Sequence, residues 1–454
     1  MSEAKKVSRT EGDVNISDLR AAWQEKFIDA KTKEMLDEDA EYFIHQALST
    51  PCMNMVSGVE GIYLVDSSGR KYMDFHGNSV HQLGYNHPYL LDAMRKQLDE
   101  LSFSPRRYAN ETATRLAKKL CSLMPSKYRV LFSPGGAESV GIALKIVRKA
   151  TGKYKTISLW DSFHGATLDA ISVGGEGHFR TGIGPLLPGC EHVMPYNSYR
   201  GLFGEGVGNA LKYAEYIEYV CHCEGDIGAI LLEPIRCTDV QVPPPEYYRK
   251  IREICDKYGV ALIFDEIPTG FGRTGKMFAF QNYDVEPDML VLGKGLGGSL
   301  FPISAVLAKE KYNVCGDISL GHYTHEKSPL GCAVGYALIE FIEEKDVLGH
   351  VAKLSALLER RLAGFMDKFE GVGDVRLIGA LCGIELVKDR KTKEKDLESA
   401  ERVLYECLEN GLSFKVSQGN VLTLAPPLVI TEEELERAMD IVESALRKFI
   451  KMTM

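Results

Sequence analysis

The sequence predicts an α/β protein, with a large domain built on a mostly parallel sheet flanked by helices and a smaller α+β domain. Two observations support this prediction. From about residue 125 to 310, short aliphatic runs alternate with helical patterns, which is typical of stacked βαβ units. Beyond about residue 340, charged helical segments are interrupted by isolated strand candidates. A chain of 454 residues is long enough to form two or three domains.

The N-terminal segment, residues 1–95, contains a helical pattern over about residues 17–48 and a hairpin candidate, GIYLVDSSGRKYMDF. Asp66 to Gly69 supply turn residues between the two halves of the hairpin. We expect this segment to pack against the small domain.

Residues 96–340 are predicted to form the large domain, with a helix from about residue 137 and another near 245–258. Its strands are predicted in YRVLF, TISLW, GAILLEPI, GVALIFDEI and DMLVLGKGL. Ligands of such folds bind at the carboxyl ends of the strands, so functional residues are expected where these runs end. Residues 341–454 are predicted to form the small domain, with strands in ALCGIELV and NVLTLAPPL.

Composition predicts a cytoplasmic protein that acts on small molecules. The net charge of −9 is spread along the chain without a basic block, which argues against a nucleic-acid partner. The N-terminus is polar and no apolar run reaches about 18 residues, so neither a signal peptide nor a membrane span is predicted. Eleven cysteines without paired CxxC spacing indicate a reducing compartment. The CHC run at 221–223 lacks a second ligand pair, so no metal site is predicted.

The first chemical motif is VLGKGLGG, in which Lys294 follows an apolar strand and stands between two glycines. A lysine amine that is partly desolvated becomes a nucleophile that forms Schiff bases with carbonyl compounds. The string also satisfies the G-x-G-x-x-G pattern of dinucleotide-binding folds, but that pattern opens a helix, whereas the strand-like FPISAVLA follows here. The position therefore favours a reactive lysine over a nucleotide loop.

Two further motifs follow other predicted strands. In LFSPGGAESVGIALKIV, glycines lead into a helix, and the backbone N–H groups of Gly136 and Ala137 are candidates to bind a phosphate. In DSFHGAT, Phe163 follows the strand TISLW and is placed to stack on a flat heteroaromatic ring.

The fourth feature is Asp265, which ends the apolar run GVALIF. A phosphate site, a stacking ring, a buried acid and a reactive lysine together are the parts that pyridoxal 5′-phosphate requires. In this hypothesis Asp265 keeps the pyridine nitrogen of the cofactor protonated, so that the ring accepts an electron pair. Lys294 holds the cofactor covalently and then moves a proton.

With these motifs, the sequence resembles the class III aminotransferase family of fold type I pyridoxal-phosphate enzymes from about residue 50 onward. The resemblance includes the block FDEIPTGFGRTG, the 29-residue spacing from Asp265 to Lys294, and Phe163-His164-Gly165. It implies that His164 and Glu233, of Glu-Pro-Ile, lie at the cofactor. It also implies a homodimer with shared active sites, in which Thr324 reaches the phosphate of the neighbouring subunit.

The departures from the family pattern bear on the reaction. Ornithine- and 4-aminobutyrate-type members have an arginine two residues before Ala-Pro-Pro-Leu and a glutamate near the Glu-Pro motif; here these positions are Thr423 and Thr238. Pro268 stands where the family has a glutamine, and Glu326-Lys327 replaces a glycine pair. The usual site for the carboxylate of a 2-oxo acid is therefore absent.

The run DFHGNSVHQLGYNHP and Pro268 are most similar to the branch of the family formed by ammonia-lyases of hydroxylated aminoethylphosphonates. This resemblance implies elimination from a small amine substrate, releasing ammonia and an aldehyde. Candidate contacts to the acidic end of the substrate are Arg236, Lys327, Arg106 and Arg107, and candidate donors of a proton to the departing hydroxide are His76 and His81.

Two alternatives stay open at this stage. The first is an ω-aminotransferase that binds its oxo acid through a different cation, and the second is a non-catalytic protein that uses the pocket for binding alone. Lys294 and Asp265 argue against the second alternative. No chemistry is assigned to Glu266.

Overall fold

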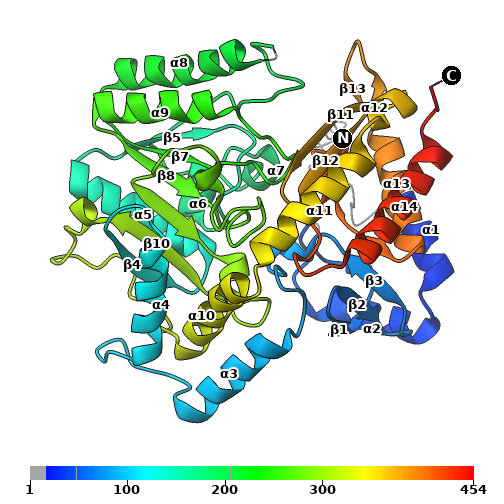
Figure 1. Ribbon diagram of the computed structural model, residues 1–454, viewed down its shortest axis with the longest axis horizontal. Helices are drawn as coiled ribbons and strands as arrows, with labels where there is room; N and C mark the ends of the chain where they lie inside the picture. Colours follow the sequence, from blue (N-terminus) through cyan, green and yellow to red (C-terminus); the bar gives the residue numbers. More distant parts are fainter. Residues whose placement is uncertain (1–16, 48, 205, 454) are drawn as a thin grey trace.

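The computed structural model describes residues 17–47, 49–204 and 206–453 and shows two lobes (Figure 1). The large lobe contains a seven-stranded sheet in the order β4-β10-β9-β8-β7-β5-β6. Neighbouring strands from β9 to β6 are parallel, whereas β10 runs antiparallel to both β4 and β9. This is the mostly parallel sheet that the sequence predicts.

The strands of the large sheet are β4 (Tyr128–Ser133), β5 (Lys155–Leu159), β6 (Cys190–Val193), β7 (Ile227–Leu232), β8 (Ala261–Asp265), β9 (Met289–Leu292) and β10 (Ser304–Lys309). Its helices are α3 (Pro88–Glu100), α4 (Glu111–Ser122), α5 (Gly136–Thr151), α6 (Leu168–Val173), α7 (Gly177–Arg180), α8 (Val207–Glu224), α9 (Pro245–Tyr258) and α10 (Pro329–Glu344). Short 3₁₀ turns are η1 (Gly77–Ser79), η2 (Ala279–Asn282), η3 (Lys294–Gly297) and η4 (Glu310–Tyr312).

The small lobe combines the N-terminal and C-terminal parts of the described chain, which lie together in Figure 1. Its helices are α1 (Asp18–Phe27), α2 (Ala30–Tyr42), α11 (Val347–Leu362), α12 (Phe365–Lys368), α13 (Leu397–Glu409) and α14 (Glu432–Phe449). Its strands are β1 (Val56–Glu60), β2 (Tyr63–Asp66), β3 (Lys71–Asp74), β11 (Val372–Ile378), β12 (Leu381–Asp389), β13 (Glu394–Lys395), β14 (Leu412–Ser413), β15 (Lys415–Ser417) and β16 (Val421–Leu424). Strand β14 pairs with β3, which joins the N-terminal hairpin to the C-terminal segment.

The single helix predicted over about residues 17–48 is wrong, because the structure has two helices there. Ser17 caps α1 by accepting a hydrogen bond from the backbone N–H of Arg20 at 3.0 Å. Asp29 caps α2 in the same way, accepting from Thr32 at 2.7 Å. An aspartate in this capping role starts a new helix, and Ile28 before it is extended.

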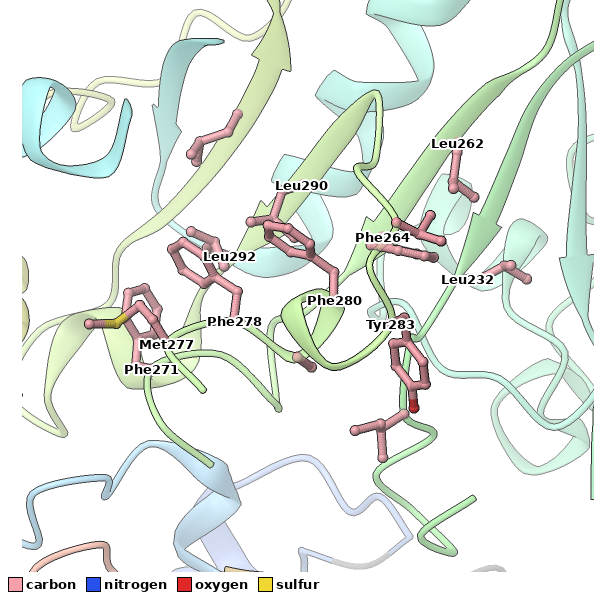
Figure 2. Packing of buried hydrophobic residues seen from close by; sticks show 14 of the residues in the cluster. Leu232, Leu262, Phe264, Phe271, Met277, Phe278, Phe280, Tyr283, Leu290 and Leu292 are labelled. Atoms are coloured by element: carbon pink, nitrogen blue, oxygen red, sulfur yellow. The ribbon is translucent and has the colours of Figure 1, made fainter. Parts of the chain in front are cut away.

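The two faces of the large sheet bury different residues because side chains alternate along a strand. One face of β7, β8 and β9 packs against residues of the segment after β8 (Figure 2). The other face packs against α5. This alternation places Asp265 on the face of α5 and directs its neighbour Glu266 to the opposite face.

Glu266 has a structural role in the segment after β8. Its carboxylate accepts hydrogen bonds from the backbone N–H groups of Ala279 and Phe280 at 2.5 and 2.7 Å. Burial raises the pKa of Glu266 to about 8 against the lowering effect of these two donors. The contacts fix the η2 turn, whose Phe280 lies over the hydrophobic face of the sheet in Figure 2.

Arg273 connects the two lobes. Its guanidinium donates hydrogen bonds to the carbonyl oxygens of Ala380 at 3.0 Å and Pro426 at 2.5 Å, both in the small lobe. The Ala380 N–H donates in return to the carbonyl of Arg273 at 3.0 Å. The segment after β8 is thereby held against the small-lobe sheet, next to the cavity described below.

All eleven cysteines are free. Within the described ranges, no cluster of three or more metal-ligating side chains is present, and the CHC run lies at the end of α8. No described helix combines the length and the apolar character that crossing a bilayer requires. The polar N-terminal stretch, residues 1–15, lies outside the described residues.

The buried carboxylate of Asp288, just before β9, forms ion pairs that provide a test of the fold. The carboxylate of Asp288 lies 2.8 Å from Arg252 and 2.8 Å from Lys311, and it accepts a hydrogen bond from the N–H of Leu262 at 3.0 Å. Burial of Asp288 raises its pKa, but the charge of Arg252 and these hydrogen bonds outweigh burial, so the pKa is lowered overall.

Replacing Asp288 by Asn is therefore expected to reduce the free energy of unfolding at neutral pH by about 1.5–3 kcal/mol, measured by urea denaturation. A carboxyl group whose pKa is lowered by folding stabilises the protein above its unfolded pKa and loses this effect as the pH falls. The deficit of D288N should accordingly shrink below about pH 4. The control D284N removes an exposed carboxylate nearby; equal stability of the two variants at neutral pH would contradict the prediction.

Candidate active site

A cavity of about 890 Å³ lies at the carboxyl ends of the parallel strands. The ends of β8 and β9 supply Asp265 and Lys294, and the segment after β5 supplies Phe163 and His164. The opposite wall comes from the small lobe, through residues of β15 and β16. The cavity therefore brings together residues that are far apart in the sequence, at the edge of the sheet where α/β folds bind their ligands.

Asp265 is 1% exposed and is held in place by two hydrogen bonds. One carboxylate oxygen lies 2.8 Å from Nδ1 of His164, and the other accepts from the backbone N–H of Ile267 at 3.0 Å. Burial lowers the pKa of His164, but the hydrogen bond and the charge of Asp265 outweigh it, so the pKa is raised overall. The pair keeps a carboxylate fixed on the cavity wall.

A backbone recess lies where β4 leads into α5. Gly135, Gly136 and Ala137 line the cavity there, and the N-cap residue Gly135 provides no side-chain cap. A Cβ atom on Gly136 would lie 2.6 Å from Cδ1 of Ile267, so a side chain there would fit only if Ile267 moved. The uncapped N–H groups at the start of a 16-residue helix form a recess suited to a phosphate.

Phe163 and Glu233 are linked on the same wall. The backbone N–H of Phe163 donates to the Glu233 carboxylate at 3.2 Å, and the Phe163 ring packs 4.5 Å from the ring of Phe179. Burial raises the pKa of Glu233. The aromatic ring lines the cavity together with Asp265.

Lys294 is positioned by an unusual backbone. Its φ of 42° lies in the left-handed region, which is costly for a residue with a side chain and is found where surrounding structure enforces it. Added Cβ atoms on Gly293 and Gly295 would lie 2.6 Å from Ser304 Oγ and 2.3 Å from the Gln82 amide, so a side chain at either position would require Ser304 or Gln82 to move. The following turn is η3, and the chain then enters β10 rather than a long helix.

These features fit pyridoxal phosphate. The side-chain-free recess suits its phosphate, the buried carboxylate suits a protonated pyridine nitrogen, and the lysine amine lies on the same cavity. The flat ring has an aromatic side chain, Phe163, on the cavity wall.

Several candidate residues do not line this cavity. Thr324 is exposed, and Lys327 lies nearby with its carbonyl accepting from Asn110 at 3.1 Å. His81 is fully buried, with Nε2 3.0 Å from the carbonyl of Asp74, and burial lowers its pKa to about 4. Arg236 makes two 2.6 Å hydrogen bonds to Asp239 and faces a separate cavity of about 210 Å³.

Among the candidate substrate contacts, His76 lines the large cavity. Arg106 and Arg107 do not contribute to its described lining. The cavity also contains residues that sequence reasoning missed, above all Ile267, Cys237, Ser304 and Lys415. Lys415 lies in the run SFKVSQG, which contains no motif of the family. Only the pairing of β15 with β16 brings it next to Thr423.

Three of the departures from the family pattern lie together on the cavity, whereas Glu326 and Lys327 are not among its described lining residues. Thr423, Thr238 and Pro268 all line it. The Thr423 hydroxyl donates to the carbonyl of Thr238 at 2.8 Å and lies 3.1 Å from Ser417 Oγ. Neutral hydroxyl groups thus occupy the place where the resemblance expects an arginine and its glutamate.

Comparisons with known proteins agree with this geometry. The family model described as aminotransferase class-III matches residues 45–446. The (R)-1-hydroxy-2-aminoethylphosphonate ammonia-lyase of Vibrio splendidus (strain 12B01) is 50% identical over 98% of this chain and 96% of its own length. The acetylornithine aminotransferase of Caldanaerobacter subterraneus subsp. tengcongensis is 34% identical over 91% of this chain and 99% of its own length.

A solved relative shares the fold. The taurine:2-oxoglutarate aminotransferase of Bifidobacterium kashiwanohense, in complex with pyridoxal phosphate and glutamate, superposes with a TM-score of 0.86 at 31% identity, covering 92% of this chain and 98% of that chain. These findings confirm the predicted fold and family, and the solved relative holds the predicted cofactor. The chain therefore belongs to the class III aminotransferase family of pyridoxal-phosphate enzymes.

Proposed function

We propose that this protein is an ammonia-lyase that acts on a small aminophosphonate such as (R)-1-hydroxy-2-aminoethylphosphonate. The main support is the 50% identity, over nearly the whole length of both chains, with the Vibrio splendidus ammonia-lyase of that substrate. The cavity supports the same reaction, because Thr423 and Thr238 offer no ion pair for the carboxylate of a 2-oxo acid.

The reaction removes a hydroxide and an amino group from neighbouring carbons. A proton leaves the carbon that bears the nitrogen, and the C–O bond of the adjacent carbon breaks, so water is lost. Water then adds to the nitrogen-bearing carbon, and ammonia leaves. The net products are the aldehyde of the same phosphonate and ammonia, with no oxidant and no second substrate.

The residues of the cavity have distinct parts in this proposal. Bound pyridoxal phosphate supplies a ring that accepts the electron pair of the broken C–H bond. Asp265, oriented by His164, holds a proton at the ring nitrogen. Gly136 and Ala137 would bind the phosphate through their N–H groups, and Phe163 would stack on the ring.

Lys294 and His76 handle the protons of the substrate. The Lys294 amine would hold the cofactor covalently and would take the proton from the substrate carbon. His76 lines the same cavity and would protonate the departing hydroxide. The ring of His81 lies beside Gly77 instead, and His81 is not among the described lining residues of the cavity.

The second candidate is an ω-aminotransferase, which the 34% identity with an acetylornithine aminotransferase favours. Such an enzyme needs a site that accepts a 2-oxo acid after the first product has left. The two candidate reactions differ in their need for this second substrate.

Incubation of the purified holoenzyme with (R)-1-hydroxy-2-aminoethylphosphonate is expected to release ammonia and an aldehyde in equal amounts without any oxo acid. The measurement is a coupled ammonia assay together with an aldehyde-trapping assay. Addition of pyruvate or 2-oxoglutarate should leave the rate unchanged, and the S enantiomer serves as the control. A strict requirement for an oxo acid would refute elimination and support the aminotransferase.

We further propose a homodimer in which Thr324 reaches the phosphate site of the neighbouring subunit. Thr324 is exposed and lies away from the cavity of its own chain, as this role requires. The nearby segment 98–108 exposes apolar side chains, namely Leu98, Leu101, Phe103 and Tyr108. Phe103 packs 5.2 Å from the ring of His325, so this apolar surface is continuous with the Thr324 segment.

A hybrid dimer tests whether Thr324 acts across the interface. The T324V variant is expected to bind pyridoxal phosphate about 10- to 100-fold more weakly, because a hydrogen bond to a charged phosphate is lost. One K294A subunit is then combined with one T324V subunit, using two affinity tags. The hybrid should contain one site with intact Lys294 and a threonine from the partner.

That site is expected to bind the cofactor with wild-type affinity, measured by fluorescence titration. The hybrid of K294A with wild type provides the reference for one intact site per dimer. If the Lys294-containing site of the K294A/T324V hybrid keeps the weak affinity of T324V, Thr324 acts within its own chain and the proposal is wrong.

A further inference from the structure

The acidic end of the proposed substrate needs a cation that the usual position does not provide. The resemblance places an arginine at position 423, where this chain has a threonine. A phosphonate carries up to two negative charges, and a cavity of limited solvent access binds such a group tightly only next to a positive charge or several donors. The cation must therefore come from another part of the cavity wall.

Strand β15 places a lysine directly opposite the position of the missing arginine. In the antiparallel pair of β15 and β16, Lys415 is the register partner of Thr423. Residues opposite each other in such a pair share one face of the sheet, with Cβ atoms about 4.5–5.5 Å apart. Lys415 and Thr423 both line the large cavity, as does Ser417, two residues further along β15.

The charge pattern of the cavity gives independent support. Cys237 lines the cavity, and burial raises the pKa of its thiol overall, while the positive charges of Lys294, Arg273 and Lys415 oppose this shift. Both lysines are thus electrostatic neighbours of one cavity residue. Among the described lining residues that the small lobe contributes, Lys415 is the charged one.

We propose that Lys415 binds the acidic end of the substrate, which is a tetrahedral phosphonate. Lys415, on β15, thereby replaces the arginine that the resemblance expects on β16. The hydroxyl group of Ser417, which lines the same cavity 3.1 Å from the Thr423 hydroxyl, is a further donor. That the anion is a phosphonate rests on the proposed function.

The exchange of residue type has a consequence for specificity. An arginine guanidinium is a planar fork that matches the two oxygens of a carboxylate. A lysine ammonium is a compact charge with three donors and imposes no planar match. A lysine with the neighbouring Ser417 hydroxyl therefore favours a phosphonate with three oxygens over a carboxylate of similar length.

The test measures the binding of an inert anion and does not depend on turnover. Ethylphosphonate and propionate are titrated into the holoenzyme by calorimetry, for wild type, K415M, K415R and the control K388M. Lys388 is an exposed lysine on β12 outside the cavity lining, so K388M removes the same charge elsewhere. The absorbance spectrum of the bound cofactor and thermal unfolding report on whether each variant is intact.

Wild type and K388M are expected to bind ethylphosphonate alike and more tightly than propionate. K415M should bind ethylphosphonate about 10- to 100-fold more weakly, and K415R should recover most of the affinity. With the aminophosphonate substrate, K415M should raise KM by a similar factor while kcat falls much less. The double variant K415M/T423R, with the cation returned to β16, should regain anion binding and shift the preference toward propionate.

The proposal is overturned if wild type does not bind ethylphosphonate, or if K415M binds it as tightly as wild type while its cofactor spectrum is intact. Should K415M fail to fold, K415Q replaces it and the same comparison decides. Failure of the proposed function is seen separately, as the absence of ammonia from the wild-type enzyme. In that case the ethylphosphonate titrations still decide whether Lys415 is an anion site.

Discussion

The contact between Asp265 and His164, 2.8 Å apart at the end of β8, is the constraint on which the rest of the site depends. A carboxylate that is 1% exposed is costly unless it is paired. His164 and the N–H of Ile267 provide this pairing and fix the direction of the carboxylate. The segment after β5 must therefore lie against the end of β8, and this packing places Phe163 on the same cavity wall.

The adjacent acids Asp265 and Glu266 show how one strand end serves chemistry and structure at once. The alternation of side chains sends Asp265 to the face of α5, where the cavity lies, and Glu266 to the opposite hydrophobic face. There Glu266 holds the η2 turn through two backbone N–H groups. Arg273, further along the same segment, ties it to the small lobe. The carboxylate of Asp265 thus lies on a segment that is fixed on both sides.

The sequence predicts the large sheet and its ligand-binding edge well, because the apolar runs that lead to Asp265 and Lys294 are visible in the local sequence. It fails where the outcome depends on contacts between distant segments. The break between α1 and α2 depends on a single capping aspartate, Asp29, within a continuous helical pattern. The position of Lys415 opposite Thr423 depends on strand register, which periodicity alone does not provide. The position of Arg236 also depends on the fold. Its partner Asp239 lies only three residues away, but the sequence does not show that the pair faces another cavity.

The protonation state of the cofactor ring nitrogen tests the central role of Asp265 most directly. Wild-type enzyme and the D265N variant are loaded with pyridoxal phosphate labelled with nitrogen-15 in the ring, and the chemical shift of that nitrogen is measured by NMR near neutral pH. The account predicts a protonated nitrogen in wild type, because a fixed carboxylate pairs with it, and an unprotonated nitrogen in D265N. The same chemical shift in both proteins would contradict it.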